Sequence, residues 1–354
     1  MLQKNNRFKI YFTNKLIYKA WGGGNNFLIN LINKLKKDKL YTKNILESDS
    51  ILFNSHQNLI SVLKYKIKFP EKYFIHRIDG PLTSYRGLLG YFQDKIIFNL
   101  NQNIADGTFF LSKWSFKENL KNGLIKSNNY KIIHNAANNE VFKKKKFILK
   151  ENTKKNKIKL IAASWSSNYL KGFDVYNYLD KNLNFSKYEM IFIGNSPVRF
   201  NNIKIISPKN HYYLYKYIIR SDIFIFASKI ESCSNLLLEA MSCGIPILLR
   251  NASSNLEIFN GNGVIFENDI DSIKKLEELV KKYNKIKIIK EIKFNDIYYK
   301  YIKYIYQIQI KGNSKRINYI YFLKMVLLIY CYKVFEFFLL KLKNILLKIN
   351  RSKI

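Results

Sequence analysis

Short runs of apolar residues alternate with longer stretches of mixed polarity along most of the chain. The short runs are rich in β-branched and aromatic residues, which favour β-strands. They cover residues 9–13, 51–55, 73–78, 107–112 and 130–135, and then 159–164, 188–194, 203–207, 223–228, 245–250 and 263–267. Because nearly every position in these runs is apolar, we expect parallel strands that helices cover on both faces.

The stretches between these runs carry apolar residues at helical spacing. The clearest of them cover residues 25–35, 113–121, 171–183, 212–219, 235–242 and 271–283. Strands that alternate with helices indicate βαβ units with right-handed crossovers. The pattern therefore predicts an α/β protein made of doubly wound, Rossmann-like sheets.

A polar and basic segment separates the two series of strands. Residues 143–157 read KKKKFILKENTKKNK, a composition typical of a solvated linker. A boundary near Glu151 leaves two halves of about 150 residues, which is a usual domain size. We therefore expect one domain at residues 1–150, a second at 151–312, and a separate tail at 313–354.

The tail combines apolar residues with nine Lys and Arg residues and one acid. On a helical wheel, five of its charged residues share an arc of about 160°. They are Lys333, Glu336, Lys341, Lys343 and Lys348, and Lys324 lies opposite them. Such a helix suits the anionic headgroup layer of a membrane, where lysine side chains extend toward the headgroups. The same pattern fits a helix that docks on its own domain or on a partner, and both interpretations stay open.

Length and cysteine content bear on the compartment. The chain has 354 residues, more than one hydrophobic core usually organises, and 47% of them are apolar. Its three cysteines cannot form a disulfide framework, which favours a reducing compartment. The N-terminal residues lack the apolar core of a secretory signal, and the uncharged run at 325–332 is far shorter than the roughly 20 residues that span a bilayer. We expect a cytoplasmic protein, peripheral on a membrane if the tail binds lipid.

The net charge is high, because 61 Lys and Arg residues against 25 Asp and Glu residues leave +36. Such a surface favours polyanions, including nucleic acids, anionic lipids and phosphorylated substrates. The abundant residues share A/T-rich codons, however, and Lys outnumbers Arg, whereas nucleic-acid readers rely on Arg. The sequence also lacks a recognition-helix or zinc-finger pattern, so we expect no specific nucleic-acid partner.

Residues 228–246 (SKIESCSNLLLEAMSCGIP) form the most specific segment of the chain. Ser234 suits the N-cap of a helix and Gly244 suits its C-terminal end. Such a helix directs the unpaired N–H groups near Asn235 and Leu236 toward the carboxyl edge of a parallel sheet, where doubly wound folds bind ligands. The segment therefore predicts a phosphate-binding helix N-terminus.

Two acidic residues flank the start of this helix. Glu231 lies in the preceding loop, beside the expected phosphates, and Glu239 lies one turn inside the helix, where it can accept hydrogen bonds from hydroxyl groups. The two could instead be a solvated loop acid and an ordinary helix acid. Their placement around the helix cap favours ligand binding.

This segment resembles the E-x7-E signature of the family 4 retaining glycosyltransferases, the glycosyl transferases group 1, which have the GT-B fold. Other segments match motifs of that family in the same order over residues 8–310. They are the glycine loop at 21–25, the histidine segment at 74–81, the turn at 133–136, the lysine segment at 164–173, the glycine turn at 193–195 and the element at 255–258. The ordered spacing, rather than any one motif, carries the resemblance.

The resemblance implies an enzyme that binds a UDP- or GDP-linked sugar in a cleft between two Rossmann-like domains, with no further cofactor. The implied catalytic residues are Glu231, which would hold sugar hydroxyls, and His76, which would face the reacting sugar or the incoming hydroxyl. Lys171 would contact the diphosphate and Glu239 the ribose. The full set of implied donor-binding residues is Gly23, Gly24, Lys171, Gly194, Ser234, Asn235, Leu236 and Glu239.

The resemblance also implies retention of the anomeric configuration and transfer without a metal ion. Acceptor contacts in this fold come from variable loops of the first domain, with residues 82–90 as the candidate region. Together with the basic tail, this predicts a glycan or lipid-linked acceptor at the cytosolic face of a membrane.

Two positions depart from the family pattern. Ser166 stands where the family usually has a basic residue, five positions before Lys171, and Cys233 stands where it usually has a small glycine. Other lysines or Arg250 could replace the missing cation. Ser166 leaves open a second interpretation, a catalytically weak GT-B homologue that acts as a membrane-associated partner subunit. A dehydrogenase does not fit, because the first strand is not followed by G-x-G-x-x-G.

Overall fold

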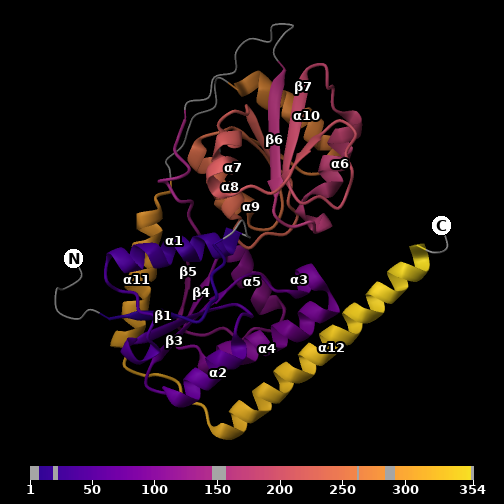
Figure 1. Cartoon of the computed structure of the whole chain (residues 1–354). Coiled ribbons are helices and arrows are strands. Elements are labelled where there is room, and N and C mark those ends of the chain that lie inside the picture. Colours follow the sequence, from indigo (N-terminus) through magenta and orange to yellow (C-terminus); the bar gives the residue numbers. More distant parts are fainter. Residues whose placement is uncertain (1–7, 19–22, 146–156, 261–262, 284–291, 352–354) are drawn as a thin grey trace.

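The structure is a computed structural model that describes residues 8–18, 23–145, 157–260, 263–283 and 292–351. It contains two parallel β-sheets, each covered by helices, and a long C-terminal helix that runs along the first half (Figure 1). The α/β architecture predicted from the hydrophobic pattern is confirmed. Most of the expected linker at 143–157, including the boundary near Glu151, lies outside the described residues.

The first half is built on a five-stranded sheet. Its strands are β1 (Ile10–Phe12), β2 (Ser50–Asn54), β3 (Tyr73–Ile78), β4 (Gly107–Phe110) and β5 (Tyr130–Ile132), which pair in that order and are all parallel. Its helices are α1 (Gly23–Lys37), α2 (Leu59–Lys68), α3 (Thr83–Arg86), α4 (Leu88–Ile104) and α5 (Lys113–Lys121).

Alternate residues of these strands serve two separate cores. Leu52 and Ile75 pack toward α1, whereas Ile51, Phe53 and Phe74 pack toward α2 and α4. Successive side chains of a strand point to opposite faces of the sheet, so the helices cover both faces. This explains why the strands read as continuous apolar runs rather than as an alternating pattern.

The second half is built on a six-stranded parallel sheet. Its strands are β6 (Ile158–Ser164), β7 (Tyr188–Gly194), β8 (Lys204–Ile206), β9 (Ile223–Phe226), β10 (Ile247–Arg250) and β11 (Gly263–Phe266). The strand order is β11-β10-β9-β6-β7-β8, so the direction of winding reverses between β6 and β9. In doubly wound folds a crevice opens at the carboxyl ends of the strands at this point.

Short and long helices connect these strands. They are the 3-10 turn η2 (Tyr169–Lys171), α6 (Phe173–Asn182), α7 (His211–Ile218), α8 (Asn235–Cys243), α9 (Asn255–Ile258) and α10 (Asp269–Lys282). The cores on the two faces are again separate, with α6 and α10 on one face and α7 and α8 on the other. Two Rossmann-like halves are therefore present, as predicted.

The chain then returns to the first half. Helix α11 (Phe294–Ile310) packs beside α1, and its residues Tyr301 and Ile305 are buried in the core of the first sheet. Tyr304 extends this contact, because its hydroxyl accepts a hydrogen bond from the Thr108 amide at 3.1 Å. The sequence-based division assigned these residues to the second domain at 151–312, since a hydrophobic pattern shows that a helix has an apolar face but not which sheet it covers.

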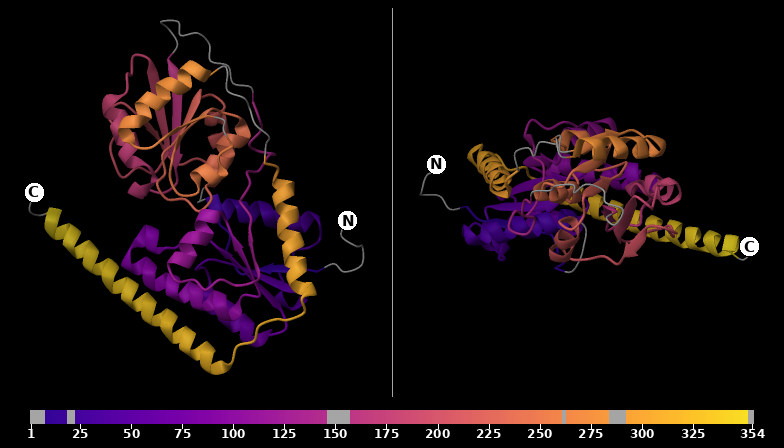
Figure 2. Two further views of the ribbon diagram at one scale, coloured as in Figure 1. Left: turned by 180° about the vertical axis from the view of Figure 1, so that it is seen from behind. Right: turned by 90° about the horizontal axis from the view of Figure 1, so that it is seen from above.

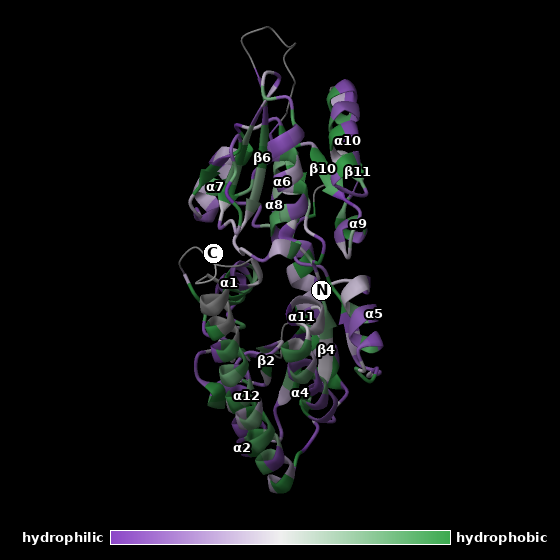
Figure 3. Cartoon of the chain, turned by 90° about the vertical axis from the view of Figure 1, so that its right-hand side faces the viewer, coloured by the Kyte–Doolittle hydropathy of each residue, from purple (hydrophilic) through white to green (hydrophobic). Residues whose placement is uncertain are grey.

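The last helix, α12 (Tyr319–Arg351), packs on the first half over its N-terminal part. Met325, Ile329 and Tyr332 lie at helical spacing and are buried in the core that contains α2 and α4. Beyond Glu336 the helix continues past the body of the domain, so its C-terminal end stands apart from it (Figure 2). Hydrophobic residues occur along much of α12, including sides that face away from the domain (Figure 3). Among the described residues, no helix is long and apolar enough to cross a bilayer.

Candidate functional site

A cavity of about 610 Å³ lies between the two halves. The second half lines it with the residues that follow β6, β7 and β9 and with the start of α8. The first half contributes the start of α1 and the segment that follows β3. The carboxyl ends of both parallel sheets therefore face one shared cleft that is partly open to solvent, which is where folds of this kind bind ligands.

Helix α8 begins at the cavity wall with the predicted cap. The Ser234 hydroxyl accepts a hydrogen bond from the Leu237 amide at 3.3 Å, and Gly244 ends the helix with a φ of 80°. A non-glycine residue rarely adopts this left-handed conformation, so Gly244 sets the C-terminal boundary. Asn235 and Leu236 occupy the first turn and line the cavity. The positive end of the α8 dipole therefore points at the cavity.

Lys171 and Glu231 form an ion pair in the same wall. Nζ of Lys171 lies 2.7 Å from Oε1 of Glu231, and both side chains are only partly exposed. Lys171 is brought there by Gly172, which has a φ of 97° and lies so close to β9 that an added Cβ would be 2.6 Å from the Ala227 backbone. The pair presents a cation and a carboxylate side by side, which suits a ligand that carries both phosphate and hydroxyl groups.

A second charged pair lies one turn inside α8. Nδ1 of His211, the first residue of α7, lies 3.1 Å from Oε1 of Glu239. Burial alone would lower the pKa of His211, but the neighbouring carboxylate outweighs burial and raises it. Sequence analysis missed His211, because its partner lies 28 positions away along the chain and the histidine has no motif around it.

The starts of α1 and α8 approach each other closely. An added Cβ on Gly23 would lie 2.7 Å from Cβ of Asn235, whereas one on Gly24 would meet nothing within 4 Å. Gly194, at the end of β7, has a φ of 133° and would place a Cβ 1.8 Å from the Ser164 carbonyl oxygen. Glycine at positions 23 and 194 therefore lets backbone segments meet at the cavity where a side chain would block them.

The structure brings nine of the ten predicted site residues around this one cavity. They are Gly23, Gly24, Lys171, Gly194, Glu231, Ser234, Asn235, Leu236 and Glu239. Their roles in binding stay predictions. Trp21 and Gly22, the first half of the expected glycine loop, lie outside the described residues.

The tenth residue, His76, lies elsewhere, which corrects its expected position at the end of a strand. Strand β3 continues for two residues past His76, so the ring is fully buried and stacks on Phe53 with 4.1 Å between ring centroids. Its Nε2 lies 3.1 Å from the Ser55 carbonyl oxygen and its Nδ1 lies 3.1 Å from Nδ2 of Asn101. Burial lowers the pKa of His76 to about 3, so the imidazole is neutral.

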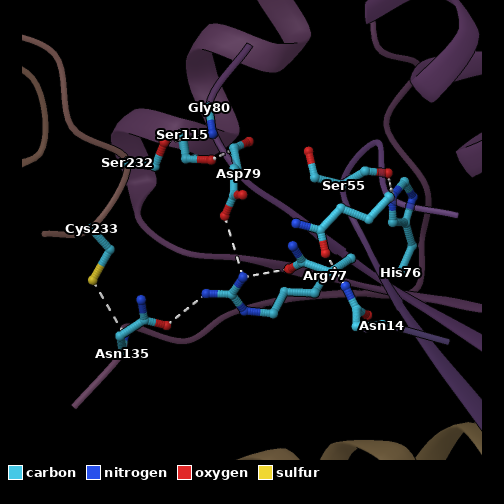
Figure 4. A network of polar contacts seen from close by, with 12 residues as sticks. Asn14, Ser55, His76, Arg77, Asp79, Gly80, Ser115, Asn135, Ser232 and Cys233 are labelled. Carbon is cyan, nitrogen blue, oxygen red and sulfur yellow. Dashed lines mark hydrogen bonds and ion pairs between the residues drawn. The ribbon is translucent and has the colours of Figure 1, made fainter. Parts of the chain in front are cut away.

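The neighbouring residues Arg77 and Asp79 reach the cavity instead (Figure 4). Arg77 is fully buried, yet its guanidinium contacts oxygen atoms of Asn54, Asp79, Asn135 and Tyr301. A buried cation is tolerated when it is surrounded by acceptors in this way. The Asp-Gly-Pro sequence after the strand marked a turn, but the sequence did not show that a buried arginine would support it.

Direct contacts join the two halves around the cavity. The Gly80 amide donates to Oγ of Ser232 at 2.5 Å, and the Asn135 amide donates to Sγ of Cys233 at 3.2 Å. Burial raises the pKa of Cys233 to about 12, so the thiol is neutral and serves as an interface group. Cys233 thus occupies the position of the family's glycine without closing the cavity.

Glu257 makes the most extensive of these contacts. Its carboxylate accepts hydrogen bonds from the Lys113 and Trp114 amides, at 2.7 and 3.1 Å, and lies 2.9 Å from Nε2 of His134. The first two are unpaired amides at the start of α5, so a residue of the second half caps a helix of the first half. Hydrogen bonds from these partners outweigh burial and lower the pKa of Glu257.

Ser166 stands where a basic residue was expected, and Arg250 does not supply the missing positive charge. Both oxygens of Asp174 accept hydrogen bonds from NH1 of Arg250, at 3.0 and 2.9 Å, and this pair lies outside the cavity lining. Ser166 itself lines the cavity, as do the basic residues Lys209 and Arg86. Within the described residues, no group of three His, Cys, Asp or Glu side chains is placed to hold a metal ion.

Residues 200–295 match the family described as glycosyl transferases group 1. This match covers α8 and both glutamates of the predicted signature. No curated protein sequence matches the chain. The resemblance to this family that the motifs indicated is confirmed.

Solved structures of similar fold cover most of the chain. Anabaena HepE in complex with UDP has a TM-score of 0.65 at 13% identity, over 85% of this chain and 100% of its own. Sucrose-phosphate synthase from Thermosynechococcus elongatus has a TM-score of 0.66 at 10% identity, over 87% and 100%. A glycosyltransferase from Rickettsia africae has a TM-score of 0.61 at 14% identity, over 86% and 99%. These similarities confirm the GT-B fold.

Proposed function

We propose that this chain is a retaining glycosyltransferase that moves a sugar from a UDP- or GDP-linked donor to a glycan or lipid-linked acceptor. The observation that carries the proposal is the grouping of Lys171, Glu231 and the start of α8 around one cavity between two Rossmann-like halves. The family match over residues 200–295 supports the same class of reaction. The complex of HepE with UDP supports a uridine nucleotide as the first donor to test.

The donor diphosphate would lie at the start of α8. The amides near Asn235 and Leu236 point at the cavity, and Lys171 adds a full positive charge. Groups fixed in this way stabilise the charge that develops on the departing diphosphate, an effect worth about 3 kcal/mol for one well-placed donor. Because the chain's own cation and amides provide this stabilisation, we propose that transfer does not require a metal ion.

The two glutamates would hold hydroxyl groups of the donor. One carboxylate oxygen of Glu231 already accepts a hydrogen bond from Lys171. In this position the carboxylate would lie between the expected phosphate and the sugar. Glu239 lies deeper, beside His211, where the ribose would follow the diphosphate along α8. Retention of the anomeric configuration is the outcome expected from the family that the motifs resemble, with attack and departure on the same face of the sugar.

The outer part of α12 supports a position at an anionic membrane surface. The apolar side chains of Phe337, Phe338 and Leu342 are each more than half exposed. Lys333 and Lys341 on the same helix are also exposed, and the chain as a whole carries a net charge of +36. Apolar side chains that insert between lipids, flanked by lysines that reach anionic headgroups, are the features of an interfacial helix. A lipid-linked acceptor would be available at such a surface.

A screen of UDP- and GDP-linked sugars for an increase in Tm of the whole chain tests the proposal. A donor present at 100 times its Kd stabilises a protein by about 2.7 kcal/mol, which is readily measured. Glu231→Gln should leave the fold intact and lower turnover of the stabilising donor by about 100-fold or more. Glu189→Gln is the matched control, because Glu189 also pairs with a lysine, at 3.8 Å from Lys159, but on the outer surface.

Two results would contradict the proposal. One is a screen in which no nucleotide sugar changes the Tm, and the other is unchanged turnover in Glu231→Gln. Ser166, which stands in the cavity lining in place of a basic residue, favours the alternative of a catalytically weak partner subunit. In that case a donor would bind, but the wild-type chain would turn it over no faster than Glu231→Gln does.

A further inference from the structure

We infer that Asp79 is a catalytic residue whose carboxylate accepts a hydrogen bond from the acceptor hydroxyl that attacks the donor sugar. The inference rests on the proposed function and assigns to Asp79 a position that the sequence assigned to His76. His76 is enclosed within β3, whereas Asp79 lines the cavity.

The backbone of Asp79 is fixed next to the loop that carries Glu231. Its carbonyl oxygen accepts hydrogen bonds from Oγ of Ser115 at 3.1 Å and from Nδ2 of Asn119 at 2.8 Å. The next residue, Gly80, donates its amide to Ser232, which directly follows Glu231 (Figure 4). The carboxylate of Asp79 is therefore held at the junction of the two halves.

The Tyr85 phenol lies in the cavity wall next to the loop that carries Glu231. Burial raises the pKa of Tyr85, and the charges of Glu231 and Asp79 both raise it further. The hydroxyl of Tyr85 also lies 3.4 Å from Oγ of Ser232. Both carboxylates thus act on one side chain of the cavity wall.

One oxygen of the Asp79 carboxylate contacts Arg77, and the other is available to a ligand. NH1 of Arg77 lies 3.3 Å from Oδ1, and the Asp79 side chain remains 40% exposed. Among the contacts of the described residues, Oδ2 has no hydrogen-bond partner. An ionised carboxylate is a hydrogen-bond acceptor only, so the open oxygen calls for a donor such as a hydroxyl group.

Arg77 keeps this carboxylate in place. Its guanidinium is fully buried, and Asn54, Asn135 and Tyr301 accept hydrogen bonds from three of its other N–H groups. These contacts fix the position of the guanidinium, and the guanidinium in turn fixes the Asp79 carboxylate. Arg77 is a positioning residue in this arrangement.

Asp79 belongs to the first half, and this indicates that the hydroxyl it binds is that of the acceptor. The side chains expected to hold the donor, such as Lys171, Glu231 and Glu239, belong to the second half, and the first half contributes only the glycines Gly23 and Gly24 to the expected donor-binding set. A carboxylate repels a diphosphate, so Asp79 does not suit the nucleotide end of the donor. It suits a neutral hydroxyl that enters from the first half, on the side of the cavity that Tyr85 and Arg86 also line.

In the transfer step Asp79 only accepts a hydrogen bond, and it does not take the proton. The acceptor oxygen forms a bond to the anomeric carbon while the bond from that carbon to the diphosphate oxygen breaks. The single hydrogen of the acceptor hydroxyl is shared between the Asp79 carboxylate and the departing phosphate oxygen, which lies on the same face when configuration is retained, and it passes to that phosphate oxygen as the bond to the anomeric carbon breaks. Asp79 stays ionised and directs the O–H group, which is a contribution of orientation.

Asp79→Asn tests the inference, because asparagine keeps an oxygen for Arg77 but presents an NH2 group where a hydroxyl must donate. We expect the Kd for UDP and GDP, measured by calorimetry, to change by no more than about twofold. Release of nucleotide from the stabilising donor, with water or octyl glycosides as acceptors, should fall about 100-fold. Circular dichroism and Tm check the fold, and Asp79→Ser replaces Asp79→Asn if the latter does not fold.

Two variants serve as controls. Asp38→Asn makes the same change on the surface of the first half, where Asp38 pairs with Lys34 at 3.0 Å, and should release nucleotide at the wild-type rate. His76→Asn should also release it at the wild-type rate per folded molecule, whatever its effect on Tm.

Each other outcome overturns the inference. An unchanged rate in Asp79→Asn removes Asp79 from the reaction, and a loss of UDP affinity equal to the loss of rate makes it a donor-binding residue. A loss in His76→Asn as large as in Asp79→Asn returns the role to the histidine. A wild-type chain that binds a donor but releases no more nucleotide than Glu231→Gln contradicts the catalytic role while donor binding stands. If no nucleotide binds, the proposed function itself fails.

Discussion

Gly23 lies where the start of α1 closely approaches the start of α8. We predict that Gly23→Ala weakens donor binding about tenfold, because its Cβ would lie 2.7 Å from Cβ of Asn235 and push the start of α1 away from the start of α8. Calorimetric titration with UDP and GDP measures the change. Gly24→Ala is the matched control, since an added Cβ there meets nothing within 4 Å. Because Gly24 also lines the cavity, this variant is compared through its stability: it should gain up to about 1 kcal/mol from helix propensity, whereas Gly23→Ala should lose stability. An equal change of Tm in the two variants would contradict the role of the close approach.

His211 and Glu239 predict a pH dependence. Glu239 raises the pKa of His211 in the folded chain, so the folded state holds this proton more tightly than the unfolded state does. The resulting stabilisation is fully present below about pH 6.5 and is lost as the pH rises through the raised pKa. We therefore expect the difference in free energy of unfolding between wild type and His211→Asn to shrink as the pH rises above about 6.5, through the raised pKa of His211. A difference that stays constant over this range would show that the pair does not titrate as described.

Single residues were predictable where a local pattern defines them. The serine cap, the terminal glycine and the spacing of the two glutamates identified α8 from the sequence alone, because each acts within one or two turns of helix. The run at 73–78 predicted the bounds of β3, but His76 was misplaced because a run that is apolar on both faces does not show that the imidazole packs on Phe53 in the core. Arg77 and His211 were missed because their partners come from other elements and are brought to them only by folding.

At the scale of elements, the structure shows that part of α12 docks on its own domain, and the membrane interpretation stays a proposal for the rest. Its first part docks on its own domain through Met325, Ile329 and Tyr332. Its outer part, from Phe337 onward, leaves apolar side chains exposed. Three of the five residues in the charged arc of the helical wheel, at positions 341, 343 and 348, belong to this outer part, whereas the first part packs against α2 and α4.

This division predicts different results for two truncations. Removal of residues 337–354 should abolish binding to vesicles of phosphatidylcholine and phosphatidylglycerol in equal parts and leave the Tm unchanged. Removal of residues 313–354 should also lower stability by several kcal/mol, because each buried side chain of α12 contributes about 1.5–3 kcal/mol. Vesicle sedimentation and thermal unfolding measure the two effects. Undiminished vesicle binding after the shorter truncation would refute the membrane role of α12.

At the scale of the whole molecule, the site exists only because the two sheets face each other. Ser232, Cys233 and Glu257 of the second half each contact the first half, and α11 extends the chain back to the first sheet. The alternation of strands and helices predicted both sheets, and the order of the motifs predicted the cleft. The pattern could not predict the return of α11, since any open sheet face would accept its apolar side.

The central claim is that the start of α8 and Lys171 bind a nucleotide diphosphate in the cavity between the halves. Calorimetric comparison of UDP and GDP with uridine and guanosine, in wild type and Lys171→Ala, tests it most directly. We predict that one diphosphate binds the wild type at least about tenfold more tightly than its nucleoside, a difference of about 1.4 kcal/mol, and that Lys171→Ala removes most of this preference. Lys159→Ala, which removes an exposed lysine paired with Glu189 on the outer surface, should retain it. Equal affinities of the wild type for diphosphate and nucleoside, or a preference that survives in Lys171→Ala, would contradict the account.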